Sequence, residues 1–241
     1  MNEDQRRQLD RDGFVLCKNV LSADEIEHLR AHLEYLWVRE GNQAGAENYI
    51  EKDARRLANL MNKGGLFRPI LCHAEVLEAA RQVLGPKVRL NMMNARDALP
   101  HSGPSQPLHS DSDHGAMPDG KGYLCFTAIW LLDDFTRANG ATRIIPGTHR
   151  RGQLPKEALA DVLAPHLDEV FVEGKAGDVF VFNGHAWHAG GANRTDRTRR
   201  AVLVHYVRGD QPQRLNQRES LSLEVQAGKN SLEREVLGLD G

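Results

Sequence analysis

Two histidines and two aspartates fall within six consecutive positions of this sequence, from His109 to His114 in the stretch QPLHSDSDHG. One residue separates His109 from Asp111, so on an extended strand both side chains project to the same face and can reach one point. Imidazole nitrogen and carboxylate oxygen suit borderline divalent metals, and two histidines with one carboxylate form the facial triad of non-haem Fe(II) oxygenases. The alternative is a solvated turn, because HxD pairs also occur in ordinary charged loops. A metal site of this kind needs a second histidine from elsewhere in the chain.

Three histidines in a later cluster of strand-like segments are candidates for that ligand: His185, His188 and His205. His188 follows the strand expected at residues 178–182, and Arg199 begins the next strand-like run. His205 falls within an alternating strand, where a core histidine is the simpler interpretation. An arginine can hold a carboxylate through two parallel, charge-assisted hydrogen bonds. An HxD pair, a distant histidine and a following arginine are therefore the parts that a site for iron and 2-oxoglutarate requires.

The elements that must position these residues change type along the chain. The stretch LSADEIEHLRAHLEYLWVREG has a serine and a glutamate at capping-box spacing before a helical apolar repeat, and AEVLEAARQVLG has the same period. From about residue 88, short apolar or alternating runs are separated by Gly-rich turns, which favours a β-sandwich or barrel over a parallel α/β sheet. A last short helix is expected at about residues 231–239. The pattern predicts helices packed around a β core.

Composition restricts the classes of function. The chain has 241 residues, with 31 Lys and Arg against 33 Asp and Glu and a net charge of −2, so no basic surface points to nucleic acid. No apolar run is long enough to span a bilayer, and the charged N-terminus does not resemble a signal peptide. Three scattered cysteines fit reduced thiols in a cytoplasm better than disulfides. We expect a cytoplasmic protein that binds neither nucleic acid nor membrane; its oligomeric state is not predicted.

Three segments together resemble a known family. HSD at residues 109–111, NGATRIIPGTH at 139–149 and WHAGGANRTDRTR at 187–199 are similar to the signature blocks of the phytanoyl-CoA dioxygenase family, and RDGFVLCKNVLSADEIEHLR is similar to its N-terminal region. The resemblance implies a double-stranded β-helix, or jelly roll, and oxidation that depends on Fe(II), 2-oxoglutarate and O2. It also implies a single domain over residues 1–241, with a helical part to about 87, a jelly-roll core at about 88–210, and a tail with a short helix at 211–241.

The resemblance assigns roles residue by residue. His109 and Asp111 match the first two iron ligands, and His188 matches the distal histidine because the family's cosubstrate arginine lies eleven positions later, at Arg199. His185 fails this spacing test, since Asp196 stands at the corresponding position. Further candidates to contact 2-oxoglutarate are Trp130, Thr127, Asn91 and Met93. Candidates for the substrate pocket are Gln106, His114 and His185.

The function implied is hydroxylation of an unactivated C–H bond in a small organic metabolite, with release of succinate and CO2. Asp111 argues against halogenation, because related halogenases have a small residue at that position. Two other classes stay open. One is a redox-silent, metal-dependent jelly-roll enzyme, either an isomerase or a hydrolase, and the other is a non-catalytic member that binds a metabolite.

Overall fold

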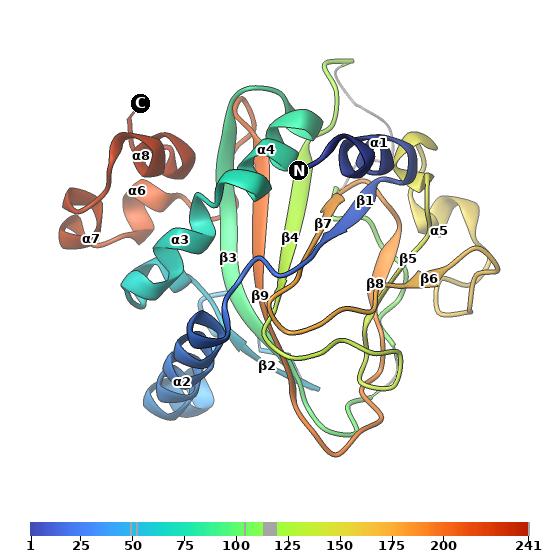
Figure 1. The fold of residues 1–241 in the computed structure, drawn as a ribbon, viewed down its shortest axis with the longest axis horizontal. Coiled ribbons are helices and arrows are strands. Elements are labelled where there is room, and N and C mark those ends of the chain that lie inside the picture. Colours follow the sequence, from blue (N-terminus) through green and yellow to red (C-terminus); the bar gives the residue numbers. More distant parts are fainter. Residues whose placement is uncertain (49, 52, 104, 113–119, 241) are drawn as a thin grey trace.

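A large antiparallel sheet is the central layer of the structure (Figure 1), a computed structural model that describes residues 1–48, 50–51, 53–103, 105–112 and 120–240. In spatial order its strands are β1 (Phe14–Cys17), β7 (Val179–Asn183), β4 (Cys125–Leu131), β9 (Arg199–Arg208), β3 (Val88–Ala98) and β2 (Ala54–Leu57). Every pairing between neighbours is antiparallel. Strands distant in sequence thus lie side by side, as the crossover connections of a jelly roll require.

A smaller sheet faces the large one. It consists of β6 (Val170–Phe171), β5 (Thr142–Ile144) and β8 (His188–Gly190), again antiparallel. An apolar cluster joins the two layers, with Ile129 and Phe182 from the large sheet and Ile144 from the small one. Two packed antiparallel sheets with flanking helices confirm the predicted jelly-roll class.

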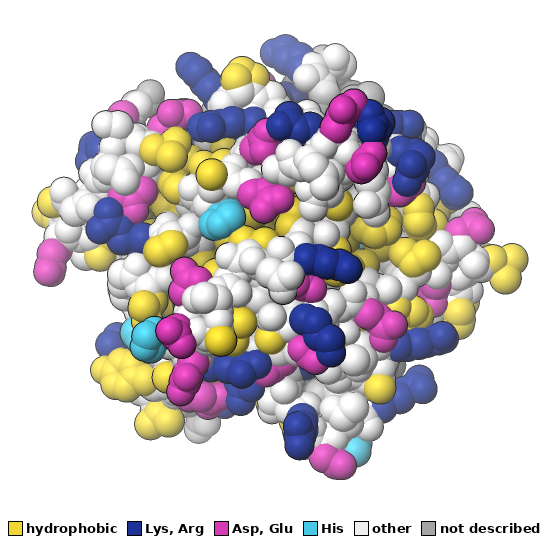
Figure 2. Space-filling view, viewed as in Figure 1, with side chains coloured by type: hydrophobic (Ala, Val, Ile, Leu, Met, Phe, Trp, Pro, Cys, Tyr) yellow, Lys and Arg dark blue, Asp and Glu magenta, His cyan; other side chains and the backbone are white. Residues whose placement is uncertain are grey.

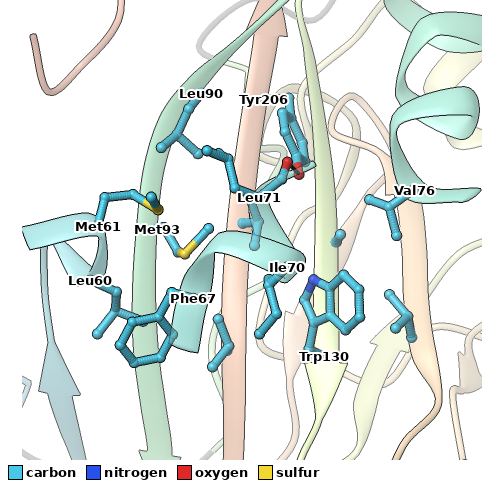
Figure 3. Close-up of a cluster of buried hydrophobic side chains, with 14 of the residues drawn as sticks. Leu60, Met61, Phe67, Ile70, Leu71, Val76, Leu90, Met93, Trp130 and Tyr206 are labelled. Carbon is cyan, nitrogen blue, oxygen red and sulfur yellow. Dashed lines mark hydrogen bonds between the residues drawn. The ribbon is translucent and has the colours of Figure 1, made fainter. Parts of the chain in front are cut away.

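Helices cover the other face of the large sheet. The longer ones are α1 (Glu3–Asp12), α2 (Ala23–Glu40), α4 (Ala74–Leu84) and α8 (Ser231–Leu237); the short ones are α3 (Arg68–Leu71), α6 (Gln217–Ser220) and α7 (Leu223–Ala227). A further short helix, α5 (Pro155–Ala158), lies beside the small sheet (Figure 1). Single 3-10 turns are η1 (Gly41–Gln43), η2 (Leu60–Asn62), η3 (Gly65–Phe67) and η4 (Thr148–Arg150). Figure 3 shows α3 packed over β3, β9 and β4, with Ile70 and Leu71 facing Met93, Trp130 and Tyr206. This interface is the main hydrophobic core.

The sequence signals for α2 and α4 were correct. Ser22 accepts a hydrogen bond from the Glu25 amide while the Glu25 carboxylate accepts one from the Ser22 amide, which completes the capping box. Leu29, Leu33 and Leu36 are buried on the helix face that the apolar repeat predicted. The N-terminal third is not wholly helical, however, because β1 and β2 join the large sheet. Both strands are four residues long and pair with β7 and β3, which lie far away in the sequence. Because such short strands depend on distant partners, the local apolar period did not predict them.

The exterior is polar and mixed in charge. Figure 2 shows Lys and Arg interspersed with Asp and Glu over the face that carries the helices. Among the described helices, none combines the length and the apolar character that a membrane crossing requires. The three cysteines, Cys17, Cys72 and Cys125, are free.

The NGATRIIPGTH segment contains two glycines with a left-handed backbone, and only one of them is also crowded by neighbouring atoms. Comparing the two therefore separates the cost of backbone strain from the cost of crowding. Gly140 has φ +84°, and a Cβ there would lie 2.6 Å from the Gly191 carbonyl oxygen; Gly147 has φ +75° with its nearest neighbour, the Arg11 carbonyl oxygen, at 3.8 Å. We predict that Gly147→Ala lowers the free energy of unfolding by about 1–2 kcal/mol from the left-handed backbone alone. Gly140→Ala should cost clearly more, because it must also displace the chain that follows β8. Urea unfolding of both variants measures the difference, and equal losses would contradict the close approach.

Candidate metal and cosubstrate site

Three side chains converge between the two sheets: His109, Asp111 and His188. Their ligand atoms all lie within 4.8 Å of one another. His188 is the first residue of β8, and His109 pairs with it in an isolated bridge in which each amide donates to the other's carbonyl at 2.9 Å. This bridge joins the HxD stretch to the small sheet. A donor set of two imidazoles and one carboxylate, gathered at one point, can hold a divalent metal and leave other positions open.

Backbone carbonyls orient both imidazole rings. Nδ1 of His109 lies 3.0 Å from the Pro107 oxygen, and Nδ1 of His188 lies 2.9 Å from the Ala186 oxygen. A carbonyl only accepts, so each Nδ1 carries the hydrogen and each Nε2 keeps a lone pair. The two Nε2 atoms lie 3.9 Å and 3.5 Å from Oδ1 of Asp111, respectively. Both lone pairs and one carboxylate oxygen thus face the same small volume.

The outer oxygen of Asp111 is held by a short hydrogen-bond chain. The Thr127 hydroxyl lies 2.6 Å from Oδ2 of Asp111 and 3.0 Å from Nδ1 of His205. The ionised carboxylate can only accept, so Thr127 donates to it and must accept from His205, which therefore carries its hydrogen on Nδ1. Thr127 and His205 are register partners on β4 and β9. The sequence favoured a core position for His205, but the structure places this histidine beside the triad.

Electrostatics at the triad match this geometry. Burial, together with the neighbouring His188, lowers the pKa of His109 to about 4. Burial also disfavours a charged His188, but the Asp111 carboxylate outweighs it and raises the pKa of that imidazole above its ordinary value. Burial opposes ionisation of Asp111 too, yet His188 and His205 hold the pKa of Asp111 well below its usual range. A stable carboxylate and a neutral His109 are the forms that bind metal.

Arg199 is a buried cation without a carboxylate partner among the described residues. It is the first residue of β9 and only 4% exposed, and its guanidinium carbon lies 4.0 Å from the centre of the Phe135 ring. Its Nε is buried without a hydrogen-bond acceptor. Burial, together with repulsion from Arg96, lowers its pKa to about 9. A buried, unpaired charge is costly, so this position suits an anionic group brought by a ligand.

The triad and Arg199 line one cavity of about 320 Å³, which we call the metal pocket. Its apolar wall consists of Ile129, Phe182, Ala201 and Leu203. Gln106 also lines it, as the sequence predicted, and the Gln106 Oε1 accepts from the Gly190 amide at 3.0 Å. A Cβ at Gly190 would lie 2.9 Å from that oxygen. In this chain, therefore, the glutamine side chain occupies the space beside β8 that a larger residue at position 190 would need.

Three of the four expected cosubstrate contacts do not line the metal pocket: the first error concerns Trp130, and the second concerns Asn91 and Met93 on β3. Trp130 points into the main hydrophobic core, packed edge-on against His73 at 5.4 Å, and not into the metal pocket. Thr127 and Trp130 are an odd number of residues apart on β4, so their side chains must lie on opposite faces. Thr127 lines the metal pocket, and its contact with 2-oxoglutarate stays a prediction. Met93 is likewise in the core, and it is Met92 that lines the pocket.

An irregularity in β3 explains the second error. The register with β9 shifts between Leu90 and Met92, which leaves Asn91 without a strand partner. Asn91 does not line the pocket; its Oδ1 instead accepts from the Arg214 amide at 2.5 Å. The bulge changes which residues of β3 face the site. Nothing in the local composition of VRLNMMN announces it.

The two remaining substrate candidates have different outcomes. His185 is 3% exposed, does not line the metal pocket, and its Nε2 accepts from the Leu124 amide at 3.1 Å. This hydrogen bond ties His185 to the start of β4, and its contact with substrate stays a prediction. His114 lies outside the described residues.

Besides Arg199, three arginines that the sequence did not place at the site line the metal pocket: Arg56, Arg96 and Arg214. Arg56 on β2 and Arg96 on β3 both bond to Glu51, at 2.8 Å from Arg56 and at 2.5 Å and 3.0 Å from Arg96. Even spacing puts Arg96 on the same face of β3 as Met92, but the bulge that turns this face to the site gives no signal in the sequence. Arg56 lies on a strand that the sequence did not predict.

Comparison with known proteins supports the family. The model of the phytanoyl-CoA dioxygenase family matches residues 9–201, which include the triad and Arg199. The chain belongs to the phytanoyl-CoA dioxygenase family. This confirms the resemblance read from the three sequence blocks. The matched segment runs from α1 to the third residue of β9, so it contains all but the end of the jelly roll.

Relatives in the phytanoyl-CoA dioxygenase family are distant in sequence. A dioxygenase of Aspergillus fumigatus is 29% identical over 214 residues, covering 85% of this chain and 66% of its own length. Ectoine dioxygenase of Bordetella parapertussis is 25% identical over 232 residues, covering 86% and 75%. The structure of HygX from Streptomyces hygroscopicus with nickel, 2-oxoglutarate and hygromycin B superimposes with a TM-score of 0.71 at 20% identity, over 88% of this chain and 90% of that one. The structural likeness shows a shared fold.

The hydroxyl of Thr127 should control metal affinity. Thr127→Val removes the donor to Asp111 and the acceptor of His205, and losses of about 10–100-fold in metal affinity are typical when such an outer contact is removed. Anaerobic equilibrium titration with Fe(II) measures the dissociation constant. Thr127→Ser keeps the hydroxyl and serves as the control. Equal affinity in the valine and serine variants would show that the hydrogen-bond chain does not hold the carboxylate.

Metal affinity should also fall as the pH is lowered. Because the pKa of His188 is raised, this imidazole is protonated below that pKa, and a metal must displace the proton before it binds. His109, with a pKa of about 4, is already neutral in this range. The Fe(II) dissociation constant should therefore rise by about tenfold for each pH unit below the His188 pKa. Titrations across neutral pH test the slope, and a flat profile would contradict it.

Proposed function

We propose that this protein is an iron(II)- and 2-oxoglutarate-dependent oxygenase that hydroxylates an unactivated C–H bond of a small organic metabolite. The observation that carries the proposal is the meeting of two features in one cavity: three side chains that can bind metal, and a buried arginine with no carboxylate partner in the described part of the chain. Iron alone would need only the first feature. A cosubstrate that chelates metal at one end and carries a carboxylate at the other needs both.

Different residues of the metal pocket would bind the metal and the cosubstrate. His109, Asp111 and His188 would hold the metal, with both Nε2 atoms and Oδ1 as ligands. Arg199 would pair with the far carboxylate of 2-oxoglutarate through charge-assisted hydrogen bonds, which also neutralises its buried charge. When bound, iron(II) supplies the redox chemistry that couples O2 and 2-oxoglutarate to oxidation of the substrate, with release of succinate and CO2.

The remaining groups keep that chemistry in place. Thr127 and His205 hold the outer oxygen of Asp111, so that its inner oxygen stays directed at the two imidazoles. The apolar wall, which includes Phe182 against the His188 ring at 4.5 Å, limits the access of water to this side of the metal. Asp111 itself occupies the position that a halide would need, which favours hydroxylation over halogenation.

Solved structures with this fold are named for different reactions, so the fold alone does not specify the reaction. One is named a carbocyclase, with a TM-score of 0.69 at 22% identity over 87% of this chain and 85% of that one. Ring closure and hydroxylation both begin with removal of a hydrogen from substrate, so the outcome depends on how substrate lies. Hydroxylation is proposed here because it is the default outcome when hydrogen is removed from an unactivated C–H bond at such a site.

Anaerobic titration of the metal-free protein with Fe(II) and 2-oxoglutarate tests the proposal. A weak visible charge-transfer band should appear in the wild type and be absent in His188→Ala. Arg199→Gln should still bind Fe(II) but should need roughly 10–100-fold more 2-oxoglutarate, because one charge-assisted pair is lost. Bound metal without a band would favour the redox-silent isomerase or hydrolase. No metal binding at all would favour a non-catalytic member.

A further inference from the structure

A second cavity adjoins the metal pocket. It has a volume of about 240 Å³, and we call it the side pocket; it is lined by Glu47, Asn48, Ala58, Asn59, Met92, Asn94, Arg214 and Leu215. Asn48, Met92 and Arg214 line both cavities, so the two meet at these three residues. A molecule that reaches the triad with one end has room for its remainder in the side pocket.

Arg214 lies at the junction and is held there by its backbone. Its amide donates to Oδ1 of Asn91 at 2.5 Å, and the next amide, of Leu215, donates to the Asn91 carbonyl at 3.4 Å. The β3 bulge thus anchors the segment that follows β9. The Arg214 side chain is exposed at the junction, and no carboxylate among the described residues pairs with it. An anchored backbone with an unpaired charged head at a cavity junction suits a ligand contact.

The charges that line the two cavities leave an excess of positive charge. Arg56, Arg96, Arg199 and Arg214 line the metal pocket, whereas Asp111 is its only acidic residue within the described chain. Glu51 bonds to both Arg56 and Arg96. With Asp111 and the keto-acid end of 2-oxoglutarate on the metal, and its far carboxylate on Arg199, the positive charge of Arg214 remains at the junction. Glu47, in the side pocket, is bonded to Lys63 at 2.8 Å, and Lys63 is also bonded to Glu40 at 2.8 Å.

Two asparagines that line the side pocket have polar atoms without a strong hydrogen-bond partner among the described residues. Asn59 is 8% exposed, has a left-handed backbone with φ +50°, and its Oδ1 is buried with no donor among the described residues. The Asn94 amide nitrogen has only the Met92 sulfur, at 3.1 Å, a weak acceptor. Buried polar atoms are normally satisfied, so these carboxamides suit a ligand with hydroxyl or amino groups.

We propose that the substrate is a polar organic anion whose carboxylate, phosphate or sulfate group pairs with Arg214 at the junction, with its hydroxyl or amino groups in the side pocket. This inference rests on the proposed function, because it assumes that 2-oxoglutarate occupies Arg199. It assigns the substrate to a class that the triad and the fold do not specify. Neutral, wholly apolar metabolites are excluded as the preferred substrate.

The test uses inorganic phosphate, inorganic sulfate and acetate as probes of the junction. The protein, loaded anaerobically with Fe(II) and saturating 2-oxoglutarate, is titrated with each anion at constant ionic strength. Binding is read both by a shift of the visible band and by calorimetry. At least one anion should bind saturably, and Arg214→Gln should weaken it by about tenfold, as expected for one charge-assisted contact. The anion that binds most tightly distinguishes phosphate or sulfate from carboxylate.

Two variants control the experiment. Arg214→Lys keeps the charge and should retain most of the affinity. Arg194→Gln removes an exposed arginine that lines neither cavity and should bind the anion like the wild type. The proposal is overturned if no anion binds saturably, or if Arg214→Gln titrates like Arg194→Gln. Failure of the band to form before any anion is added would instead count against the proposed function, while calorimetry still reports whether Arg214 binds anions.

Discussion

Successive side chains of a β-strand point to opposite faces of the sheet, and this period of two organises the molecule. On β4 and β9 the partners Thr127 and His205 face the metal pocket, while Ala128 and Val204 face the helices. One face of the large sheet therefore builds the site, and the other builds the core that keeps the strands in register. A slip of one residue in either strand would exchange the two faces and abolish both.

Buried charge is the second constraint on the site. Asp111 remains ionised in a buried setting because histidines and a hydroxyl surround it. Arg199 has no such compensation among the described carboxylates, and its pKa is lowered by burial and by Arg96. An unpaired buried cation lowers the stability of the folded chain, and natural proteins tolerate such groups mainly where a ligand completes them. The two groups lie in one cavity, so a single bound molecule could satisfy the arginine and reach the metal.

The opposite end of the cavity is built differently. The triad and Arg199 come from the strands or from backbone bridges to them, whereas Asn48 and Arg214 come from the segments outside the jelly roll. Loops and tails vary more readily than a hydrogen-bonded sheet. This division suits a fold on which proteins named for different reactions are built. It also places the features that select substrate at Arg214 and the carboxamides of the side pocket, away from the chemical groups.

The sequence by itself was enough for the fold class, the helices α2 and α4, and the four residues that meet in the metal pocket. Each of these depends on local spacing, on capping, or on blocks of sequence shared with a family. Tertiary structure alone decided which face of a strand each residue occupies. The bulge at Asn91 moved Met93 into the core and brought Met92 to the pocket, and pairing with β9 placed His205 beside Asp111. Pairing between distant segments decides which face of the sheet a strand residue occupies, and it also sets long-range contacts such as that of Asn91 with Arg214. The local sequence pattern does not specify this pairing.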